Sequence, residues 1–306
     1  MRRLLIATVI ALAAAPGAAR EQTLDNGLRV VLIQHRANPM VASAVVVGAG
    51  VVDESREAGG ASHFLEHLLF NGTTTRTQRQ LYDDADRIGA YNNASTREDH
   101  TLFTLLVQKA HAEEGLAIQA DMLFRSTIPE ENFEKERKIV LEELARDRTD
   151  PSYETESAFR AFAFGGTPIA RPVLGTEASL AAITRAQVLA YYKARYVPGN
   201  MTLVVMGDFE LDEMTAAVKR TFGAPKSAPS PKEPASRWPS APKQNVEVAA
   251  AEKGPPRLLA AFPLDVAPWD DAAIAADVLL AAASEGADSP LALALERRGV
   301  AATESS

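Results

Sequence analysis

Residues 59–73 read Gly-Gly-Ala-Ser-His-Phe-Leu-Glu-His-Leu-Leu-Phe-Asn-Gly-Thr, and this stretch carries more information than any other part of the chain. Gly59-Gly60 and Asn71-Gly72-Thr73 are breaks of the kind that flank helices, so the sequence predicts a helix that begins at residue 61 and ends at residue 70. On that helix the two histidines lie one turn apart on the same face.

Within this helix, His63, Glu66 and His67 form the pattern H-x-x-E-H. In that order the two imidazoles bind one zinc ion, and the carboxylate between them is close enough to act on a zinc-bound water. Glu66 is therefore predicted as the general base, which takes a proton from that water and passes it to the leaving amine. The structural alternative, in which these side chains only pack or cap the helix, is disfavoured because the whole pattern is present.

A catalytic zinc ion needs a third protein ligand and an open position for water. The charged segment 129–146 offers candidates, and chemistry alone does not choose among Glu134, Glu136, Glu142 and Glu143. Glu136 and Glu143 are seven residues apart, which places them on one helix face two turns apart. The chain has no cysteine, so thiolate ligands and a thiol nucleophile are excluded.

The composition is that of a globular protein, with 46% hydrophobic and 24% charged residues among 306. The formal net charge is −8, and no basic stripe is present, so nucleic acid is not an expected partner. His35, His100 and His111 stand alone in the sequence and are predicted to be surface or hydrogen-bonded residues rather than metal ligands.

The N-terminus has the pattern of a secretory signal peptide. Arg2-Arg3 precedes an apolar run from Leu4 to about Ala15, and small residues follow at 17–19. We therefore expect residues 1–19 to be a cleavable signal and the protein to be periplasmic or secreted. No later segment is apolar enough to predict a stable membrane span.

Helices and strands alternate along residues 20–223 without regular βαβ spacing, which favours an α+β fold. Asn26-Gly27 predicts a tight turn between extended runs, and strands are predicted over 41–52, 101–107 and 201–206. Helices are predicted over four further segments, 77–88, 112–124, 129–146 and 184–193, the last with a capping box formed by Thr184 and Gln187.

The segment 224–243 contains six prolines among Ser, Lys and Ala and is predicted to be a domain linker. An extended run over 246–264 and an Ala-rich helix over 270–283 follow it. About sixty residues after a linker rarely form a stable domain alone. Residues 244–306 are therefore expected to be the beginning of a second, truncated domain.

Several motifs resemble those of the pitrilysin/insulinase family of zinc peptidases. Within that family, they are most similar to the smaller bacterial members related to the mitochondrial processing peptidase. Besides 59–73, they are Asn93-Ala-Ser-Thr96, Asp99-His-Thr-Leu-Phe103, Phe133-Glu-Lys-Glu-Arg-Lys-Ile-Val-Leu-Glu-Glu-Leu144, Pro172-Val-Leu-Gly-Thr176 and Asn200-Met-Thr-Leu-Val-Val-Met-Gly-Asp208. The resemblance implies a curved, mostly antiparallel sheet with helices on one face, followed by a second similar domain.

The resemblance also implies roles for particular residues. It selects Glu143 as the third ligand of a single zinc ion, and it makes Glu136 the outer acid that orients the ligands. Peptide substrates would add as a strand to the sheet edge at Asn93, Ala94 and Ser95, beside Phe70. Taken without the resemblance, Asn92-Asn93 would be read as a turn.

One motif departs from the family pattern. Peptidases of the family carry an Arg and a Tyr in the second domain, where this chain has Glu296 and Ala302. The expected function is zinc-dependent hydrolysis of short or unfolded peptides, as a homo- or heterodimer with a paralogous subunit. The alternatives are a non-catalytic scaffold subunit, or a half-enzyme that needs a paralogue to supply the missing Arg/Tyr pair.

Overall fold

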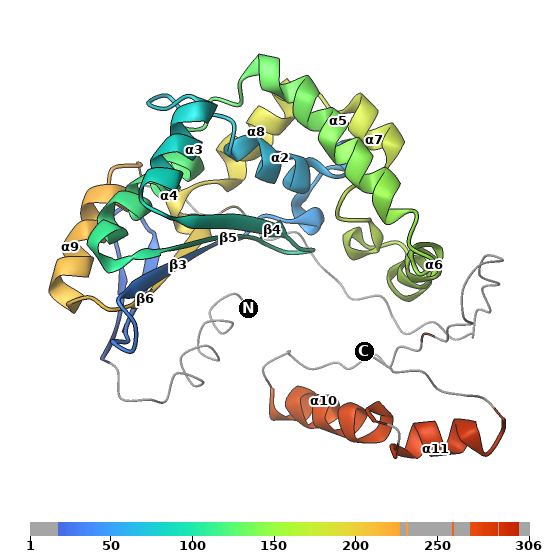
Figure 1. Ribbon diagram of the computed structural model, residues 1–306. Coiled ribbons are helices and arrows are strands. Elements are labelled where there is room, and N and C mark those ends of the chain that lie inside the picture. The colour runs from blue at the N-terminus through green and yellow to red at the C-terminus, as the bar shows by residue number, and fades with distance from the viewer. Residues whose placement is uncertain (1–17, 227–230, 232–258, 260–269, 287, 300–306) are drawn as a thin grey trace. The chain divides into compact units, whose positions relative to one another are not determined.

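The computed structural model of this chain describes residues 18–226, 231, 259, 270–286 and 288–299 (Figure 1). Residues 18–226 contain a six-stranded sheet and most of the helices. The strand order is β1-β2-β6-β3-β5-β4, and only β2 and β6 run parallel. The strands are β1 Ala19–Thr23, β2 Arg29–Gln34, β3 Met40–Val47, β4 Tyr91–Thr96, β5 Thr101–Gln108 and β6 Met201–Gly207.

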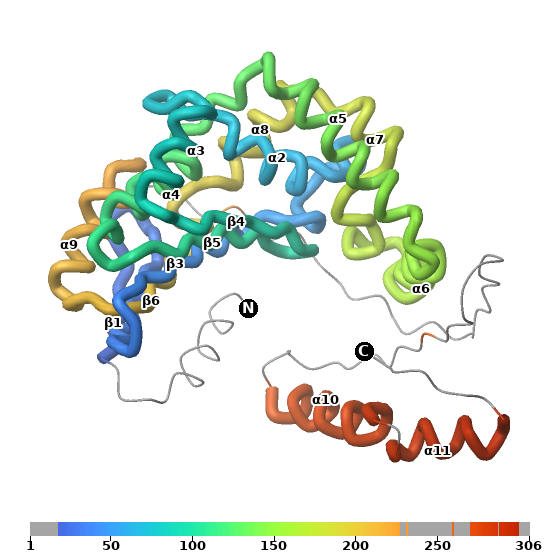
Figure 2. The backbone as a smooth tube through the Cα atoms, viewed as in Figure 1, coloured from blue at the N-terminus to red at the C-terminus, as the bar shows by residue number. Residues whose placement is uncertain are grey.

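Helices cover one face of this sheet, with α2, α4 and α9 lying directly against strands (Figures 1 and 2). The α-helices of this unit are α2 Ala61–Leu69, α3 Gln78–Arg87, α4 Ala112–Arg125, α5 Glu130–Asp147, α6 Tyr153–Phe164, α7 Glu177–Ala182, α8 Arg185–Arg195 and α9 Leu211–Phe222. The predicted fold class, a mostly antiparallel sheet with helices on one face, is confirmed.

The sheet owes its two unlike faces to alternation of side chains along each strand. In β5 the side chains of Thr101, Phe103, Leu105 and Val107 are buried, whereas the residues between them are partly or fully exposed. The strands β3 and β6 follow the same period. The buried face packs against the apolar sides of the helices in two clusters. The larger one joins Phe103 to α2, which lies over β4 and β5, and the smaller one joins Leu105 and Val107 to residues of α3 and α4.

The predicted strand over 41–52 is too long, because β3 ends at Val47 and a 3₁₀ turn, Val51–Asp53, follows. Gly50 explains the early end. A Cβ atom at this position would lie 2.6 Å from the carbonyl oxygen of Arg97 and 2.7 Å from that of Glu98. The chain therefore leaves the sheet where only glycine allows such close backbone approach. The Asn26-Gly27 turn and the Thr184–Gln187 capping box are both present.

Two further helices, α10 Asp271–Ser284 and α11 Pro290–Glu296, belong to a separate unit. The α10 helix agrees with the helix predicted over 270–283. Most of the predicted linker and of the extended run 246–264, and all but the last two residues of the predicted signal peptide, lie outside the described residues. Those expectations and the second-domain boundary stay predictions. Among the described residues, no helix has both the length and the apolar character needed to span a bilayer.

Candidate metal centre and peptide cleft

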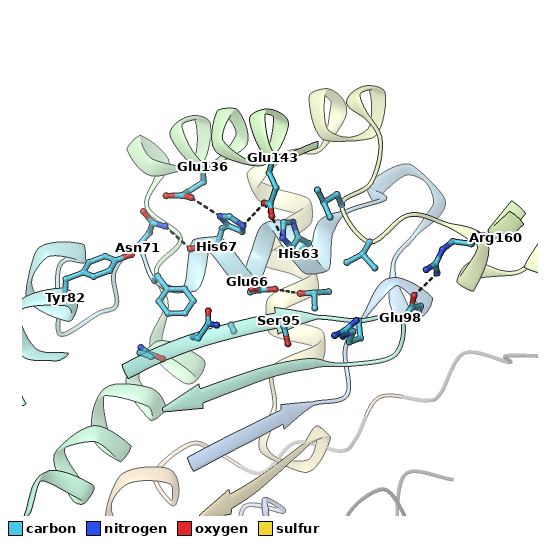
Figure 3. A pocket seen from close by; sticks show the side chains of 18 residues that line it. His63, Glu66, His67, Asn71, Tyr82, Ser95, Glu98, Glu136, Glu143 and Arg160 are labelled. Atoms are coloured by element: carbon cyan, nitrogen blue, oxygen red, sulfur yellow. Dashed lines mark hydrogen bonds and ion pairs between the residues drawn. The ribbon is translucent and has the colours of Figure 1, made fainter. Parts of the chain in front are cut away.

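The helix α2 presents the three motif side chains toward α5 and the end of β4 (Figure 3). The imidazole rings of His63 and His67 have centroids 4.8 Å apart and lie at 70° to one another, as one-turn spacing requires. The His63 and Glu66 side chains are buried, whereas His67 is partly exposed. One face of α2 therefore holds two nitrogen ligands and a carboxylate at the bottom of a cleft.

Packing between α2 and α5 determines where Glu143 lies. The rings of Phe64 and Phe133 are in contact, with centroids 4.8 Å apart, and the Arg137 guanidinium lies over both. Arg137 also donates to the carbonyl of Ile183 at 2.8 Å, which anchors α5 to the segment after α7. Since Phe133, Glu136 and Val140 are buried on the same face of α5, the next turn directs Glu143 toward the histidines.

His63, His67 and Glu143 form a triangle that fits a metal ion. Their ligand atoms all lie within 4.8 Å of one another. Glu143 Oε2 is 3.7 Å from His63 Nε2 and 3.5 Å from His67 Nε2. In a tetrahedron with zinc–ligand bonds near 2.1 Å, two ligand atoms are roughly 3.4 Å apart, so the donor types suit zinc and the two Glu143 distances are close to this spacing.

Glu136 lies on the far side of His67, with Oε2 3.4 Å from Nδ1 (Figure 3). Burial acts to raise the pKa of Glu136, but its interactions with His67 and Asn71 outweigh burial and lower it. An ionised carboxylate beside Nδ1 favours the tautomer that carries its proton there, and this leaves Nε2 as the metal ligand. The outer contact that the family resemblance implies for Glu136 is therefore present.

The two histidines differ in their environments. Burial, followed by the neighbouring His67, lowers the pKa of His63 to about 4, so this imidazole is neutral at ordinary pH. Burial also acts to lower the pKa of His67, but Glu136 and Glu143 outweigh it and raise the pKa. Within the described part of the chain, His63 Nδ1 is buried without a hydrogen-bond partner. Of the two histidines, His67 thus has an outer carboxylate to orient it, and His63 has none among the described residues.

We expect Glu136→Gln to weaken zinc binding about 10- to 100-fold, the usual cost of losing an outer partner of a ligating histidine. The amide keeps the shape of the side chain but removes the charge that favours a proton on His67 Nδ1. Competition with a fluorescent zinc chelator measures the affinity. Glu131→Gln, exposed in the first turn of α5, is the matched control and should bind zinc like the wild type. Equal affinity for Glu136→Gln and wild type would contradict the outer role.

Glu66 faces the opposite wall of the cleft. Its Oε2 accepts a hydrogen bond of 2.5 Å from the Thr96 hydroxyl, at the end of β4. Burial raises the pKa of Glu66, and the bond from Thr96 partly opposes that rise. A carboxylate whose proton affinity is raised, beside a cluster of metal ligands, has the property that a general base requires.

A cleft of about 710 Å³ runs between α2 and the free edge of β4. Glu66, the three ligands and the predicted substrate residues Phe70, Asn93, Ala94 and Ser95 all line it. Among the described strands, β4 pairs with β5 alone and ends the sheet, so its outer edge can receive a further strand along the cleft. The structure therefore brings every predicted site residue into one cavity.

The far wall of the cleft is the segment around Val173 and Leu174, which touches the start of α2 through two glycines. Gly60 (φ +90°) would place a Cβ atom 2.6 Å from the carbonyl oxygen of Leu174. Gly175 (φ +76°) would place one 2.5 Å from the carbonyl oxygen of Gly59. A side chain at either position would clash with backbone, so this contact requires glycine on both sides.

A buried carboxylate holds the N-terminus of α2. Glu54 accepts from the backbone N–H of Gly60 at 2.9 Å and of Ser62 at 2.8 Å. No side chain at the N-cap position does so, because that residue is Gly60. Burial raises the pKa of Glu54 to about 7, against the lowering effect of these two bonds. Glu54 thus satisfies free N–H groups in the first turn of the helix that carries the histidines.

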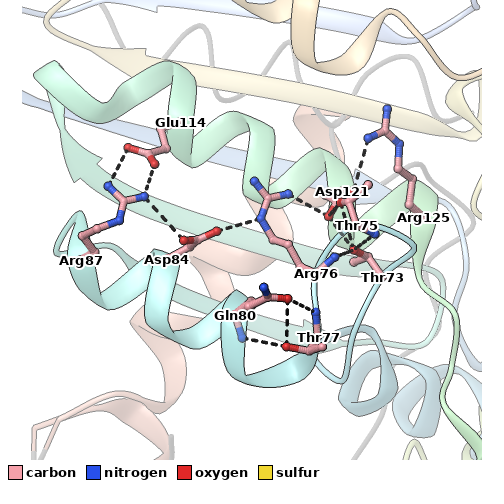
Figure 4. Close-up of polar contacts among 10 residues, drawn as sticks. All are labelled: Thr73, Thr75, Arg76, Thr77, Gln80, Asp84, Arg87, Glu114, Asp121 and Arg125. Carbon is pink, nitrogen blue, oxygen red and sulfur yellow. Dashed lines mark hydrogen bonds and ion pairs between the residues drawn. The ribbon is translucent and has the colours of Figure 1, made fainter.

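The loop that follows α2 is attached to α4 by a second buried carboxylate (Figure 4). Asp121 Oδ2 accepts from the hydroxyls of Thr73 and Thr75 at 2.6 and 2.7 Å and from Arg76 Nη1 at 2.8 Å. Arg76 also donates to Asp84 on α3 at 2.9 Å. Hydrogen bonds to the buried carboxylates Glu54 and Asp121 therefore restrain the chain at both ends of α2.

Comparison with known proteins agrees with this geometry. Residues 29–177 match the profile described as insulinase (peptidase family M16), and residues 182–306 match the peptidase M16 inactive domain. This chain belongs to the M16 peptidase family. The predicted family resemblance is therefore confirmed.

Named relatives and solved structures give the same result. An uncharacterized zinc protease of Mycobacterium leprae is 38% identical over 66% of this chain and 45% of its own length. A probable mitochondrial-processing peptidase subunit beta of Arabidopsis thaliana is 31% identical over 69% and 40%. The crystal structure of the periplasmic protease PqqL of Escherichia coli superposes with a TM-score of 0.68 at 26% identity, covering 76% of this chain and 26% of that one. The chain spans about half the length of the curated relatives it matches.

Proposed function

We propose that this M16 family member is a zinc-dependent endopeptidase that hydrolyses short or unfolded peptides. The observation that carries the proposal is the convergence of His63, His67 and Glu143 beside Glu66 in a cleft that also contains a free sheet edge. Relatives named zinc proteases support the same class of reaction and the same metal.

The chain's own residues would share the work as follows. His63, His67 and Glu143 would hold zinc, which when bound lowers the pKa of water and polarises a scissile carbonyl. Glu66 would accept the proton of the attacking water and deliver it to the leaving amine nitrogen. Glu136 would keep His67 in the tautomer that presents Nε2.

The edge of β4 would position the substrate. Backbone groups of Asn93, Ala94 and Ser95 would pair with an extended peptide, and such pairing requires no particular side-chain sequence. Phe70 and Leu174 offer apolar surface on either side of the metal ligands. Only an extended segment can pair with a strand edge, and this favours short or unfolded substrates over folded domains.

We also propose export to the periplasm or exterior, from the N-terminal Arg2-Arg3 and apolar run, and assembly with a second, related subunit. The second proposal is supported by the relative named as a peptidase subunit beta and by Glu296, which stands where peptidases of the family carry Arg. The non-catalytic scaffold alternative is not favoured, since His63, His67 and Glu143 form a group that could hold a metal ion.

Metal removal tests the proposed function. The full-length protein, assayed on an internally quenched unstructured peptide, is expected to lose its turnover with a zinc chelator and to regain it with one equivalent of zinc. Metal analysis of the same samples should give one zinc per chain. The proposal would be contradicted if the protein, shown by metal analysis to be free of metal, still hydrolysed the peptide in the presence of the chelator. The assay should be run with and without a related subunit, so that a partner requirement is measured directly.

A further inference from the structure

The hydroxyl of Thr96 is the one hydrogen-bond donor to the Glu66 side chain among the residues that the structure describes. Thr96 and Glu66 are 8% and 9% exposed, so the 2.5 Å bond between them is shielded from water. Hydrogen bonds to carboxylates are stronger than neutral ones, and more so when buried. Thr96 is the last residue of β4, the strand that lines the cleft.

Neighbouring groups direct the single Thr96 proton to Glu66. Thr101, its partner across β4 and β5, has its hydroxyl oxygen 3.5 Å from that of Thr96. The Thr101 hydroxyl donates its own proton to the Ala49 carbonyl at 2.9 Å. Thr101 therefore cannot donate to Thr96, and its oxygen, at 3.5 Å, is a much weaker acceptor for the Thr96 proton than the Glu66 carboxylate at 2.5 Å. β-Branching also restricts χ1 of Thr96, so the hydroxyl has few other directions.

We propose that Thr96 is a positioning residue, which holds the base Glu66 in the orientation that proton transfer requires. The terminal torsion of a glutamate is broad, so a carboxylate without a partner samples many orientations. The bond to Oε2 fixes one oxygen and leaves Oε1 as the oxygen free to accept a proton. This inference rests on the proposed function, in which Glu66 acts as the base.

The placement of Thr96 also connects substrate binding to the base. Asn93, Ala94 and Ser95 line the cleft on the same strand, within three residues of Thr96. Thus one short strand supplies both the edge that would receive peptide and the donor that orients Glu66. Among the described residues, the Thr96 hydroxyl forms no hydrogen bond with the metal ligands or with cleft-facing backbone groups. Its effect on catalysis should therefore pass through Glu66.

Thr96→Val tests this directly, because valine keeps the branched shape and removes the hydroxyl. We expect kcat to fall about 10- to 100-fold, the range for one hydrogen bond to a charged group, whereas KM and zinc content stay within about twofold of wild type. Thr96→Ser keeps the hydroxyl and should restore most of the kcat. Thr202→Val, the same change on β6 of the same sheet, is the matched control and should leave kcat unchanged.

A double variant separates positioning from a purely structural role. In a Glu66→Gln background the base is absent, so adding Thr96→Val should change the residual single-turnover rate by less than about twofold. If Thr96→Val lowered the rate equally in both backgrounds, the inference would be overturned. An unchanged kcat in Thr96→Val, or a Thr96→Ser variant as slow as Thr96→Val, would overturn it as well. If Glu66→Gln itself turned over like the wild type, the proposed function would fail instead, which keeps the two failures distinct.

Discussion

Glu66→Gln is expected to lower kcat by about 10³-fold or more while zinc stays bound. General acid–base groups contribute roughly 10²- to 10⁴-fold to enzymatic rates, and here one carboxylate would act on both the attacking water and the leaving amine. The amide cannot accept a proton, but it keeps the size of the side chain and can still accept the Thr96 hydrogen bond. The loss should therefore be one of chemistry and not of fold.

Hydrolysis of a quenched peptide and metal analysis on the same sample give the result. Glu57→Gln is the matched control, because Glu57 is exposed and lies in the loop before α2. The control should keep both zinc and turnover. Wild-type turnover in Glu66→Gln would remove the base assignment, and loss of zinc together with turnover would show that Glu66 acts on the metal site instead.

Glu143→Gln is expected to weaken zinc binding by more than the 10- to 100-fold that loss of an outer partner costs. Glu143 is the donor that approaches both imidazoles, at 3.7 and 3.5 Å, and it supplies the negative charge among the three ligands. A neutral amide oxygen in its place is a weaker donor for zinc. Turnover should fall in proportion to the zinc lost and recover in part at high zinc concentration.

Glu142→Gln provides a sharp comparison, since the two glutamates are adjacent on α5 and only Glu142 is exposed. The expected order of zinc affinity is wild type equal to Glu142→Gln, then Glu136→Gln, then Glu143→Gln, measured by chelator competition at one pH. A larger loss in Glu142→Gln than in Glu143→Gln would mean that α5 presents a different face to the histidines.

Local features of the site could be predicted from the residues alone, whereas its long-range features could be predicted only from the family resemblance. His63, Glu66 and His67 are close because of helical periodicity, which the sequence displays directly. Glu143 lies 76 positions beyond His67, and helix geometry alone left four glutamates open. What places Glu143 is the packing of Phe64 on Phe133 under Arg137, a tertiary contact without a local sequence signal.

Glu54 and Thr96 were not predicted as functional, for a related reason. Glu54 is one of two glutamates in the loop before α2, and only the folded chain shows that it, and not Glu57, is buried against the helix N-terminus. Thr96 was part of a recognised motif, but its role depends on the meeting of β4 with α2. Likewise β3 ends early because Gly50 touches a loop almost fifty residues away, which no propensity reports.

Gly60 and Gly175, whose backbones are in contact, have a consequence for the redesign of substrate preference. At these two positions one wall of the cleft meets the start of the metal-bearing helix through backbone, whereas Val173 and Leu174 beside them contribute side chains to the cleft. A single added methyl group at either glycine would instead push wall and helix apart. Redesign of substrate preference at this wall should therefore target Val173 and leave both glycines unchanged.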